Sequence, residues 1–168
     1  IQSPKKFVSP PTAKRYTELT TPKNEVIIAP YDAKNIYMVQ LHNENQEWSA
    51  DRAPIIALFN EYFGGSMNAI VFQELREARG LAYSAFAKYN EPYRLSDKED
   101  FYTYIITQND KMMDCVHEFN KLLDNMPVRQ ANFDLAKQSL MKSLASQRTT
   151  KYAILTSYLA AQRLGIDY

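Results

Sequence analysis

The sequence predicts an α+β fold: a two-layer sandwich in which a mainly antiparallel sheet carries helices on one face. The order of the predicted elements leads to this class, because two strand-like runs are followed by two helix-like runs, two more strand-like runs and three helices. Strands that follow each other without a helix between them pair antiparallel, and the segregated helices then cover one face. A chain of 168 residues is long enough for one domain with a substantial core.

Residues 1–23 are predicted to be a linker or extended segment, because four prolines fall within them. Residues 24–168 form the predicted domain. Its first strand is expected at Asn24–Ala29, which ends at Pro30, and its second at Asn35–His42, which is rich in β-forming side chains.

Two helices are expected next. The first follows Asp51, a candidate cap, with Pro54 in its first turn. Apolar residues recur along it at helical spacing, which predicts one core face: Ile55, Leu58, Phe59 and Tyr62. The second is expected over Met67–Ala78, with a stripe that faces the sheet: Ile70, Val71, Leu75 and Ala78.

The second half of the domain repeats the strand-then-helix order. Strands are expected at Ala82–Tyr89 and at Asp100–Thr107, on either side of a polar loop. A helix then begins at Asp110 and breaks at Met126-Pro127, and its predicted core face contains Met113, Val116, Phe119, Leu122 and Leu123. Two further helices are predicted at about 130–147 and 151–164.

Composition excludes several classes of function. Twenty basic and nineteen acidic residues give a net charge of +1, which argues against a nucleic-acid binder. No apolar run reaches the roughly 20 residues of a membrane span. The single cysteine, Cys115, is expected to be a buried apolar residue, and it leaves cytoplasm and periplasm both open. The chain begins with Ile1 rather than methionine and stops just after Gly165, so we expect a fragment of a longer protein, with a domain truncated at its C-terminus.

Three of the four glycines, Gly64, Gly65 and Gly80, border the helix predicted at Met67–Ala78. Glycine is needed where the backbone requires positive φ or close approach, so a structural turn is expected at each end of this helix. Ser66 is a candidate helix cap. Glu74 falls within the apolar stripe, and a buried carboxylate needs a partner, so a structural pairing with Arg79 is expected.

Arg76 and Tyr83 lie on opposite sides of the Gly80 turn. A guanidinium offers five N–H donors and a phenol offers one, so together they suit a carbonyl, a carboxylate or a tetrahedral oxyanion. Tyr83 is expected to share a strand face with Ala85 and Ala87. From the residues alone, an ordinary helix-end arginine and a half-buried tyrosine remain the simpler interpretation.

The segment Tyr62–Ser84 reads Y-F-G-G-S-M-N-A-I-V-F-Q-E-L-R-E-A-R-G-L-A-Y-S. It resembles the C-terminal-type domain of the insulinase/pitrilysin-type zinc peptidases, which include the mitochondrial processing peptidases and commonly read G-G-x-x-S-x-L-F-Q-E-L-R-E-x-R-G-L-A-Y-S there. The order of elements over residues 20–168 resembles that family's repeated domain. The sequence departs from the family at Asn68 and Val71, where serine and leucine are usual.

The resemblance implies a non-zinc domain of a zinc metalloendopeptidase, in which Arg76 and Tyr83 bind the peptide substrate near the scissile bond. The family's zinc motif, H-x-x-E-H, is missing: the chain has only His42 and His117, which lie 75 positions apart and are expected to be surface or capping residues. Zinc is therefore expected in a partner domain or subunit that carries H-x-x-E-H, and no catalytic residue is expected in this chain, which alone would be inactive.

Two other functions stay open. One is a catalytically inactive scaffold or assembly subunit of the same fold. The other is a stand-alone module that binds unfolded peptides.

Overall fold

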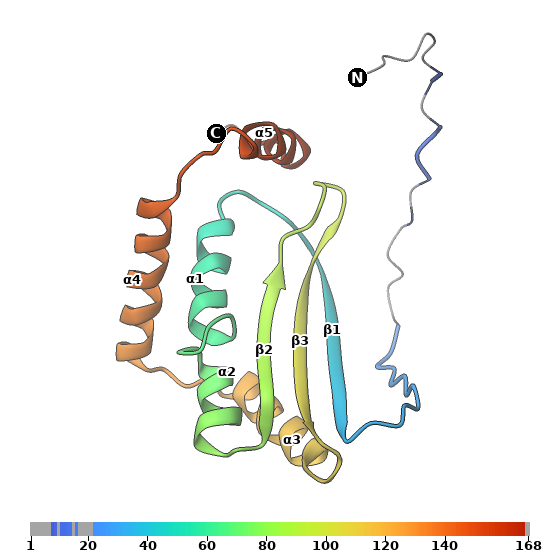
Figure 1. Cartoon of the computed structure of the whole chain (residues 1–168), viewed down its shortest axis with the longest axis vertical. Helices are drawn as coiled ribbons and strands as arrows, with labels where there is room; N and C mark the ends of the chain where they lie inside the picture. The colour runs from blue at the N-terminus through green and yellow to red at the C-terminus, as the bar shows by residue number, and fades with distance from the viewer. Residues whose placement is uncertain (1–7, 10, 15, 17–21, 167–168) are drawn as a thin grey trace.

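The computed structural model describes residues 8–9, 11–14, 16 and 22–166 (Figure 1). The predicted linker, residues 1–23, lies largely outside this described part. The sheet of the described residues has three antiparallel strands in the order β1-β3-β2: β1 is Asn35–Glu47, β2 is Ala82–Asn90 and β3 is Lys98–Gln108. Three of the four predicted strands are therefore present, and the α+β class is confirmed.

The strand predicted at Asn24–Ala29 is wrong. These residues lie outside any sheet, and the side chains of Val26, Ile27 and Ile28 are between 82% and 90% exposed. Their β-branched composition favours extended backbone, but a strand also needs a partner. Among the described residues, β1 pairs only with β3, so this run has none.

Helices follow the predicted order with shifted ends. Figure 1 shows α1, α2 and α4 beside the sheet, and α5 across one end of it. Two short irregular turns accompany the α-helices: a π-helical turn, η1, which continues α2, and a 3-10 turn, η2, which precedes α3. The bounds are Ala53–Phe63 for α1, Ile70–Phe72 for α2, Gln73–Ala78 for η1, Asn109–Lys111 for η2, Met112–Asp124 for α3, Gln130–Ser146 for α4 and Ala153–Leu164 for α5.

The core lies between one face of the sheet and the helices. Burial alternates along β3, as expected for a strand with one covered face. The buried cluster joins sheet residues to residues of α1, α2, η1 and α3, among them Phe63, Ile70, Val71, Leu75, Ala85, Phe101, Ile105, Cys115 and Phe119. The predicted layer of helices on one face is thus confirmed.

Several helix details differ from the sequence expectations. Four residues were predicted on core faces and are exposed: Ile55, Ala78, Met113 and Leu123. The exposure of Ala78 follows from the π-helical turn, because i→i+5 bonding rotates each later side chain away from the position it has in an α-helix. Asp51 and Ser66 are not caps: α1 and α2 have no side-chain cap hydrogen bond, and Ser66 Oγ donates to Glu61 O over 3.2 Å.

The end of α1 is joined to the outer edge of β2 through backbone. Ala87 N donates to Gly64 O over 3.2 Å, and the Asn60 amide both donates to Tyr89 O and accepts from Tyr89 N, at 3.0 and 2.8 Å. A Cβ on Gly64 would stand 2.1 Å from Ala87 O. Glycine at this position therefore allows helix and strand backbones to meet, and α1 covers part of an edge that would otherwise be open.

Substituting Gly64→Ala is expected to destabilise the fold by about 3 kcal/mol, because the new methyl group would overlap backbone that cannot rotate away. Gly80→Ala is the matched control. Gly80 has φ 57° and nothing within 4 Å of an added Cβ, so only the left-handed conformation costs energy, about 1 kcal/mol. Urea unfolding of both variants measures the difference, and equal losses would contradict the close-approach explanation.

Candidate functional site

Arg76 lies on the π-helical turn η1, where i→i+5 hydrogen bonds replace the α-helical pattern. Its side chain is 46% exposed, and its guanidinium stacks on the Phe72 ring, 4.8 Å from the centroid. Within the described residues its one ion pair is to Glu77, with 3.8 Å between Arg76 Nε and Glu77 Oε1. Arg76 is therefore positioned by an aromatic ring, while most of its N–H donors remain available to a ligand.

The turn between Arg76 and Tyr83 is fixed from several directions. Gly80 adopts the left-handed conformation at the end of η1, and its N–H donates to Arg76 O over 3.0 Å. Lys111 Nζ donates to Gly80 O over 3.2 Å, and Leu81 O accepts from Thr107 Oγ1 over 2.5 Å. These contacts tie the turn to β3 and to η2, so the spacing between Arg76 and Tyr83 is held by the core.

Tyr83 is the extra residue of a β-bulge. Ala82 pairs with Thr107 and Ser84 with Ile106, so no residue of β3 is left opposite Tyr83. The expectation that Tyr83 shares a face with Ala85 and Ala87 is therefore wrong: both alanines are at most 2% exposed, whereas Tyr83 is 55% exposed. The bulge breaks the alternation of side chains and turns the tyrosine outward.

The phenol of Tyr83 accepts a hydrogen bond from Gln108 Nε2 over 2.8 Å. Because Gln108 donates, the phenol keeps its own O–H for another acceptor. Among the described residues, no hydrogen bond or ion pair joins Arg76 to Tyr83 directly. Arg76, before the Gly80 turn, and Tyr83, after it, therefore each have N–H or O–H donors that face solvent.

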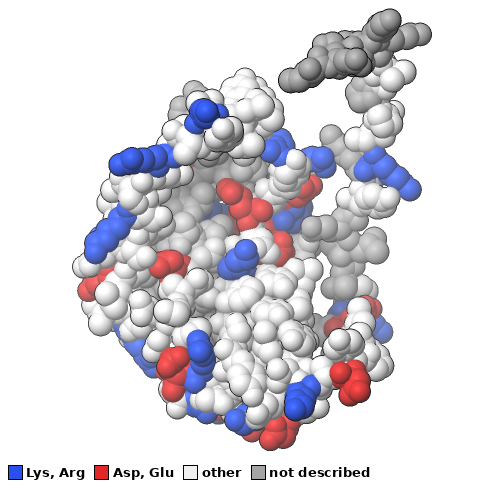
Figure 2. Space-filling model, in the orientation of Figure 1, with Lys and Arg blue, Asp and Glu red and all other residues white. Residues whose placement is uncertain are grey.

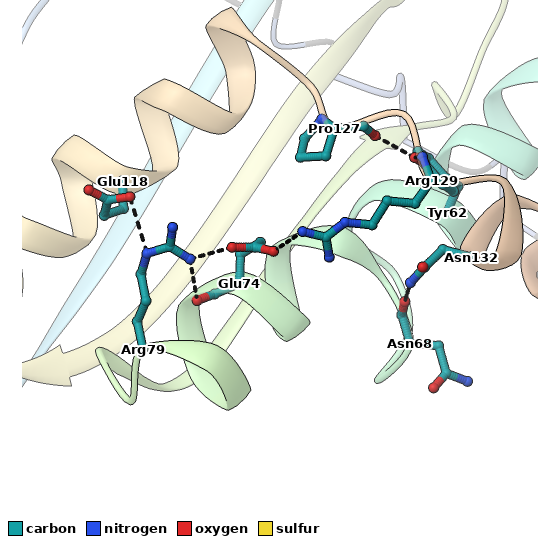
Figure 3. A network of polar contacts seen from close by, with 8 residues as sticks. All are labelled: Tyr62, Asn68, Glu74, Arg79, Glu118, Pro127, Arg129 and Asn132. Carbon is teal, nitrogen blue, oxygen red and sulfur yellow. Dashed lines mark hydrogen bonds and ion pairs between the residues drawn. The ribbon is translucent and has the colours of Figure 1, made fainter.

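A second arginine of the same segment, Arg79, is engaged in a structural network (Figure 3). Arg79 Nη1 contacts one carboxylate oxygen of Glu74, Arg129 Nη2 contacts the other, and Arg79 Nε lies 3.2 Å from Glu118. The expected pairing of Glu74 with Arg79 is confirmed, and Arg129 is a partner that the sequence did not reveal. The Glu74 carboxylate therefore links η1 to α3 and to the start of α4.

Tyr62 extends this network toward α1. Its hydroxyl donates to Pro127 O over 2.5 Å and accepts from Arg129 N over 3.0 Å. Burial is the largest influence on Glu74 and opposes its ionisation, but hydrogen bonds and charge from Arg79 and Arg129 together outweigh it, so the pKa of Glu74 lies below its ordinary value. The carboxylate is ionised and fully paired at neutral pH.

The other titratable candidates are structural or solvated. Cys115 is fully buried, its Sγ donates to Leu81 O over 3.3 Å, and burial raises the pKa of its thiol. Its predicted apolar role is confirmed. His42 and His117 are both exposed, on β1 and α3. Over the described residues, no group of three or more His, Cys, Asp or Glu side chains is placed to hold a metal ion, so these side chains do not fit a zinc site.

The comparisons with known proteins agree with this arrangement. The family model described as "Peptidase M16 inactive domain" matches residues 2–140. The chain belongs to the peptidase M16 inactive-domain family. A crystal structure of a peptidase M16 inactive domain from Pseudomonas fluorescens shares the fold, with a TM-score of 0.59 and 19% sequence identity over 79% of this chain. The search of curated proteins gave no match.

This M16 inactive domain covers 31% of the chain of that crystal structure. The family assignment agrees with the resemblance seen in the sequence, which is to a non-zinc domain of this peptidase family that is itself non-catalytic. Of the helices that the structure describes, none combines the length and apolar character needed to span a bilayer.

Three residues of the site region escaped prediction from the sequence. Asn60 pairs with the edge of β2, Gln108 holds the Tyr83 hydroxyl, and Arg129 neutralises Glu74. Each acts over a separation of 25 to 55 positions, which no local periodicity records. Only one of these contacts had a signal in the sequence. Glu74 lies within an apolar stripe, and its carboxylate there requires a cationic partner, which the structure identifies as Arg129 in addition to Arg79.

Replacing the buried carboxylate by an amide, Glu74→Gln, is expected to lower stability by about 2 kcal/mol, because Arg79 and Arg129 lose their shared counter-charge. Glu77→Gln is the matched control: Glu77 is 53% exposed, its ion pair spans 3.8 Å, and its replacement is expected to change little. Urea unfolding at neutral pH compares the two variants.

The wild type and the Glu74→Gln variant also test the lowered pKa of Glu74. Because the pKa of Glu74 is lowered by folding, its stabilisation is fully present above the ordinary pKa of a glutamate and is lost as the pH falls through the lowered value. The stability difference between the wild type and Glu74→Gln should therefore shrink in acid. A difference that stays constant from neutral to strongly acidic pH would contradict the assignment.

Proposed function

We propose that this chain is the non-zinc domain of a zinc-dependent metalloendopeptidase, where it closes the proteolytic chamber and binds the peptide substrate through Arg76 and Tyr83. The observation that carries the proposal is the pairing of two local backbone irregularities. Arg76 stands on a π-helical turn and Tyr83 on a β-bulge, and both kinds of irregularity are over-represented at functional sites. The core holds the turn between them.

The contrast between neighbouring arginines supports the role of Arg76. Arg79 is bound by Glu74 and Glu118, whereas Arg76 has one loose ion pair and stacks on Phe72. Because most of its N–H groups are unpaired within the described part of the chain, the Arg76 guanidinium can donate to a substrate carbonyl. It can equally donate to the oxyanion that forms when water attacks that carbonyl. The free O–H of Tyr83 would donate to the same group or to the next carbonyl of the peptide.

The edge of β2 supplies a second element of peptide binding. Gly64 and Asn60 of the α1 end bind this edge at Ala87 and Tyr89, and within the described part of the chain they make no such hydrogen bonds to its first half, beside Tyr83. An extended peptide would pair there by β-addition, which uses main-chain hydrogen bonds and so tolerates many sequences. The partner domain with H-x-x-E-H would supply zinc, the attacking water and the glutamate base.

One observation favours a scaffold as the second candidate. Helices α4 and α5 expose many apolar side chains, among them Leu135, Met141, Leu144, Ile154, Leu155 and Tyr158, each more than half exposed. Such surfaces are typical of protein–protein contacts. The presence or absence of H-x-x-E-H in the remaining polypeptide or in a partner chain distinguishes a peptidase from an inactive assembly subunit. A stand-alone peptide-binding module would bind unfolded peptides without any partner, which calorimetry detects.

In the full-length peptidase, Tyr83→Phe and Arg76→Ala are each expected to lower kcat/KM for an unfolded peptide on the order of 10- to 100-fold, because each removes a donor to the developing oxyanion. Zinc content should remain that of the wild type, because in this proposal the H-x-x-E-H motif of the partner domain holds the metal and neither residue is a ligand.

Tyr152→Phe and Arg148→Ala are matched controls, since both residues are exposed and lie outside the site. These two variants should keep wild-type turnover. Unchanged kcat/KM in both Tyr83→Phe and Arg76→Ala would refute the substrate-binding role.

A further inference from the structure

Gln108 is the last residue of β3, and its side chain reaches the hydroxyl of the candidate site. It stands at the end of the central strand of the described sheet, in register with Asn35 of β1. Its amide Nε2 donates to the Tyr83 hydroxyl oxygen, 2.8 Å away on the neighbouring strand. Among the described residues that oxygen has no other hydrogen-bond partner, so Gln108 alone sets how the hydroxyl is held.

Tyr83 has little else to fix its side chain. It is the extra residue of the β-bulge, so no residue of β3 stands opposite it, and it is 55% exposed. Within the described part of the chain no aromatic ring packs against it, whereas the Arg76 guanidinium rests on the Phe72 ring. The two donors of the candidate site are therefore positioned differently, Arg76 by a ring and Tyr83 by one hydrogen bond.

The contact belongs to a group of three donors from one short segment. Thr107 Oγ1 donates to Leu81 O over 2.5 Å, and Lys111 Nζ donates to Gly80 O over 3.2 Å. These two bonds hold the backbone of the turn. The bond from Gln108 reaches a partly exposed side-chain hydroxyl instead, where a hydrogen bond adds little to folding stability. Its main consequence is the orientation of that hydroxyl.

The direction of this hydrogen bond determines what the phenol can do. A phenol oxygen both accepts and donates. An amide N–H on the oxygen disfavours orientations in which the hydroxyl hydrogen points back at Gln108, so the hydrogen is directed away from β3. The oxygen also becomes part of a chain of hydrogen bonds, in which each bond polarises the next and strengthens it. Both effects prepare the Tyr83 O–H for an acceptor that arrives from outside.

We propose that Gln108 is a positioning residue of the peptide site, whose amide directs the Tyr83 O–H toward the carbonyl or oxyanion of a bound peptide. The inference rests on the proposed function, in which Tyr83 donates to the substrate. Gln108 does not touch the substrate and acts only through Tyr83. Because the hydroxyl is oriented before the oxyanion develops, the effect falls on kcat rather than on KM.

A neutral donor suits this place in the fold. In Figure 2, basic and acidic side chains both lie at the lower end of the molecule, where Figure 1 shows β2 beginning and the chain passing into α3. Asp110 and Lys111 follow Gln108 within η2. The amide thus supplies direction without adding to either sign of charge, and variants that change the direction of the bond are the appropriate test.

The test uses the full-length peptidase and two replacements of Gln108. Methionine has a similar length but no N–H, so the hydroxyl becomes free to turn. In Gln108→Met, kcat for an unfolded peptide should fall on the order of 3- to 10-fold, with KM little changed. Glutamate keeps the shape but accepts a hydrogen bond, so it draws the O–H away from the substrate. In Gln108→Glu, kcat should fall further, toward that of Tyr83→Phe.

Tyr83→Phe provides the background that separates positioning from a direct effect, because it lacks the hydroxyl. There, both replacements of Gln108 should leave kcat within about two-fold of Tyr83→Phe alone, whereas a direct effect of the glutamate charge on the substrate would persist. Gln138→Met and Gln138→Glu are matched controls at an exposed glutamine of α4, and both should keep wild-type kcat. If Gln108→Met loses the near-UV circular dichroism of the wild type, Gln108→Thr takes its place, since a β-branched side chain favours a strand.

Three results would overturn the inference. The first is wild-type kcat in both Gln108 variants. The second is a higher kcat in Gln108→Glu than in Gln108→Met, which a purely structural hydrogen bond predicts. The third is an equal loss with and without the Tyr83 hydroxyl. Each leaves the proposed function standing if Arg76→Ala and Tyr83→Phe still slow cleavage. If those two variants are unaffected, the proposed function fails and this inference fails with it.

Discussion

The backbone contact between Gly64 and Ala87 is the constraint on which the arrangement of this domain depends. It brings the end of α1 against the outer edge of β2, at a separation that no Cβ would permit. Asn60 then extends the contact by pairing with Tyr89 as an additional strand would. Because both ends of the segment between Gly64 and β2 are thereby fixed, α2 and η1 must return along β2 within a short length of chain. The π-helical turn and the left-handed Gly80 complete that return.

Ion pairing then distinguishes the two arginines of this segment, Arg76 and Arg79. The ionised Glu74 lies on η1 with its side chain only 12% exposed, and a carboxylate so little hydrated requires compensation close by. Arg79 and Arg129 both provide it, and Glu118 occupies the remaining side of Arg79. Arg76, one helical turn earlier, is left outside this network and rests on Phe72. The same packing that fixes one guanidinium therefore leaves the other with unused donors at the surface.

Local patterns predicted most of the elements, because helical periodicity and β-branched runs are written in consecutive residues. They failed where a partner decides the structure. The run Val26–Ile28 has strand composition but no neighbouring strand among the residues that the structure describes, and Ala78 leaves the core because η1 is a π-helical turn. The Tyr83 bulge depends on the register with β3, and the role of Arg129 depends on how α4 begins. The positions of Arg76 and Tyr83 relative to Gly80 were predictable; their surroundings were not.

The helices are divided unequally over this sheet. Among the described elements, α1, α2, η1 and α3 contact its strands, α4 packs on α1, and α5 lies across one end. The turn that carries Arg76 and Tyr83 belongs to the part with contacts to β2 and β3. Thr107 and Lys111 hold its backbone carbonyl groups, so the packed core rather than a loose loop sets where the two donors of the candidate site stand.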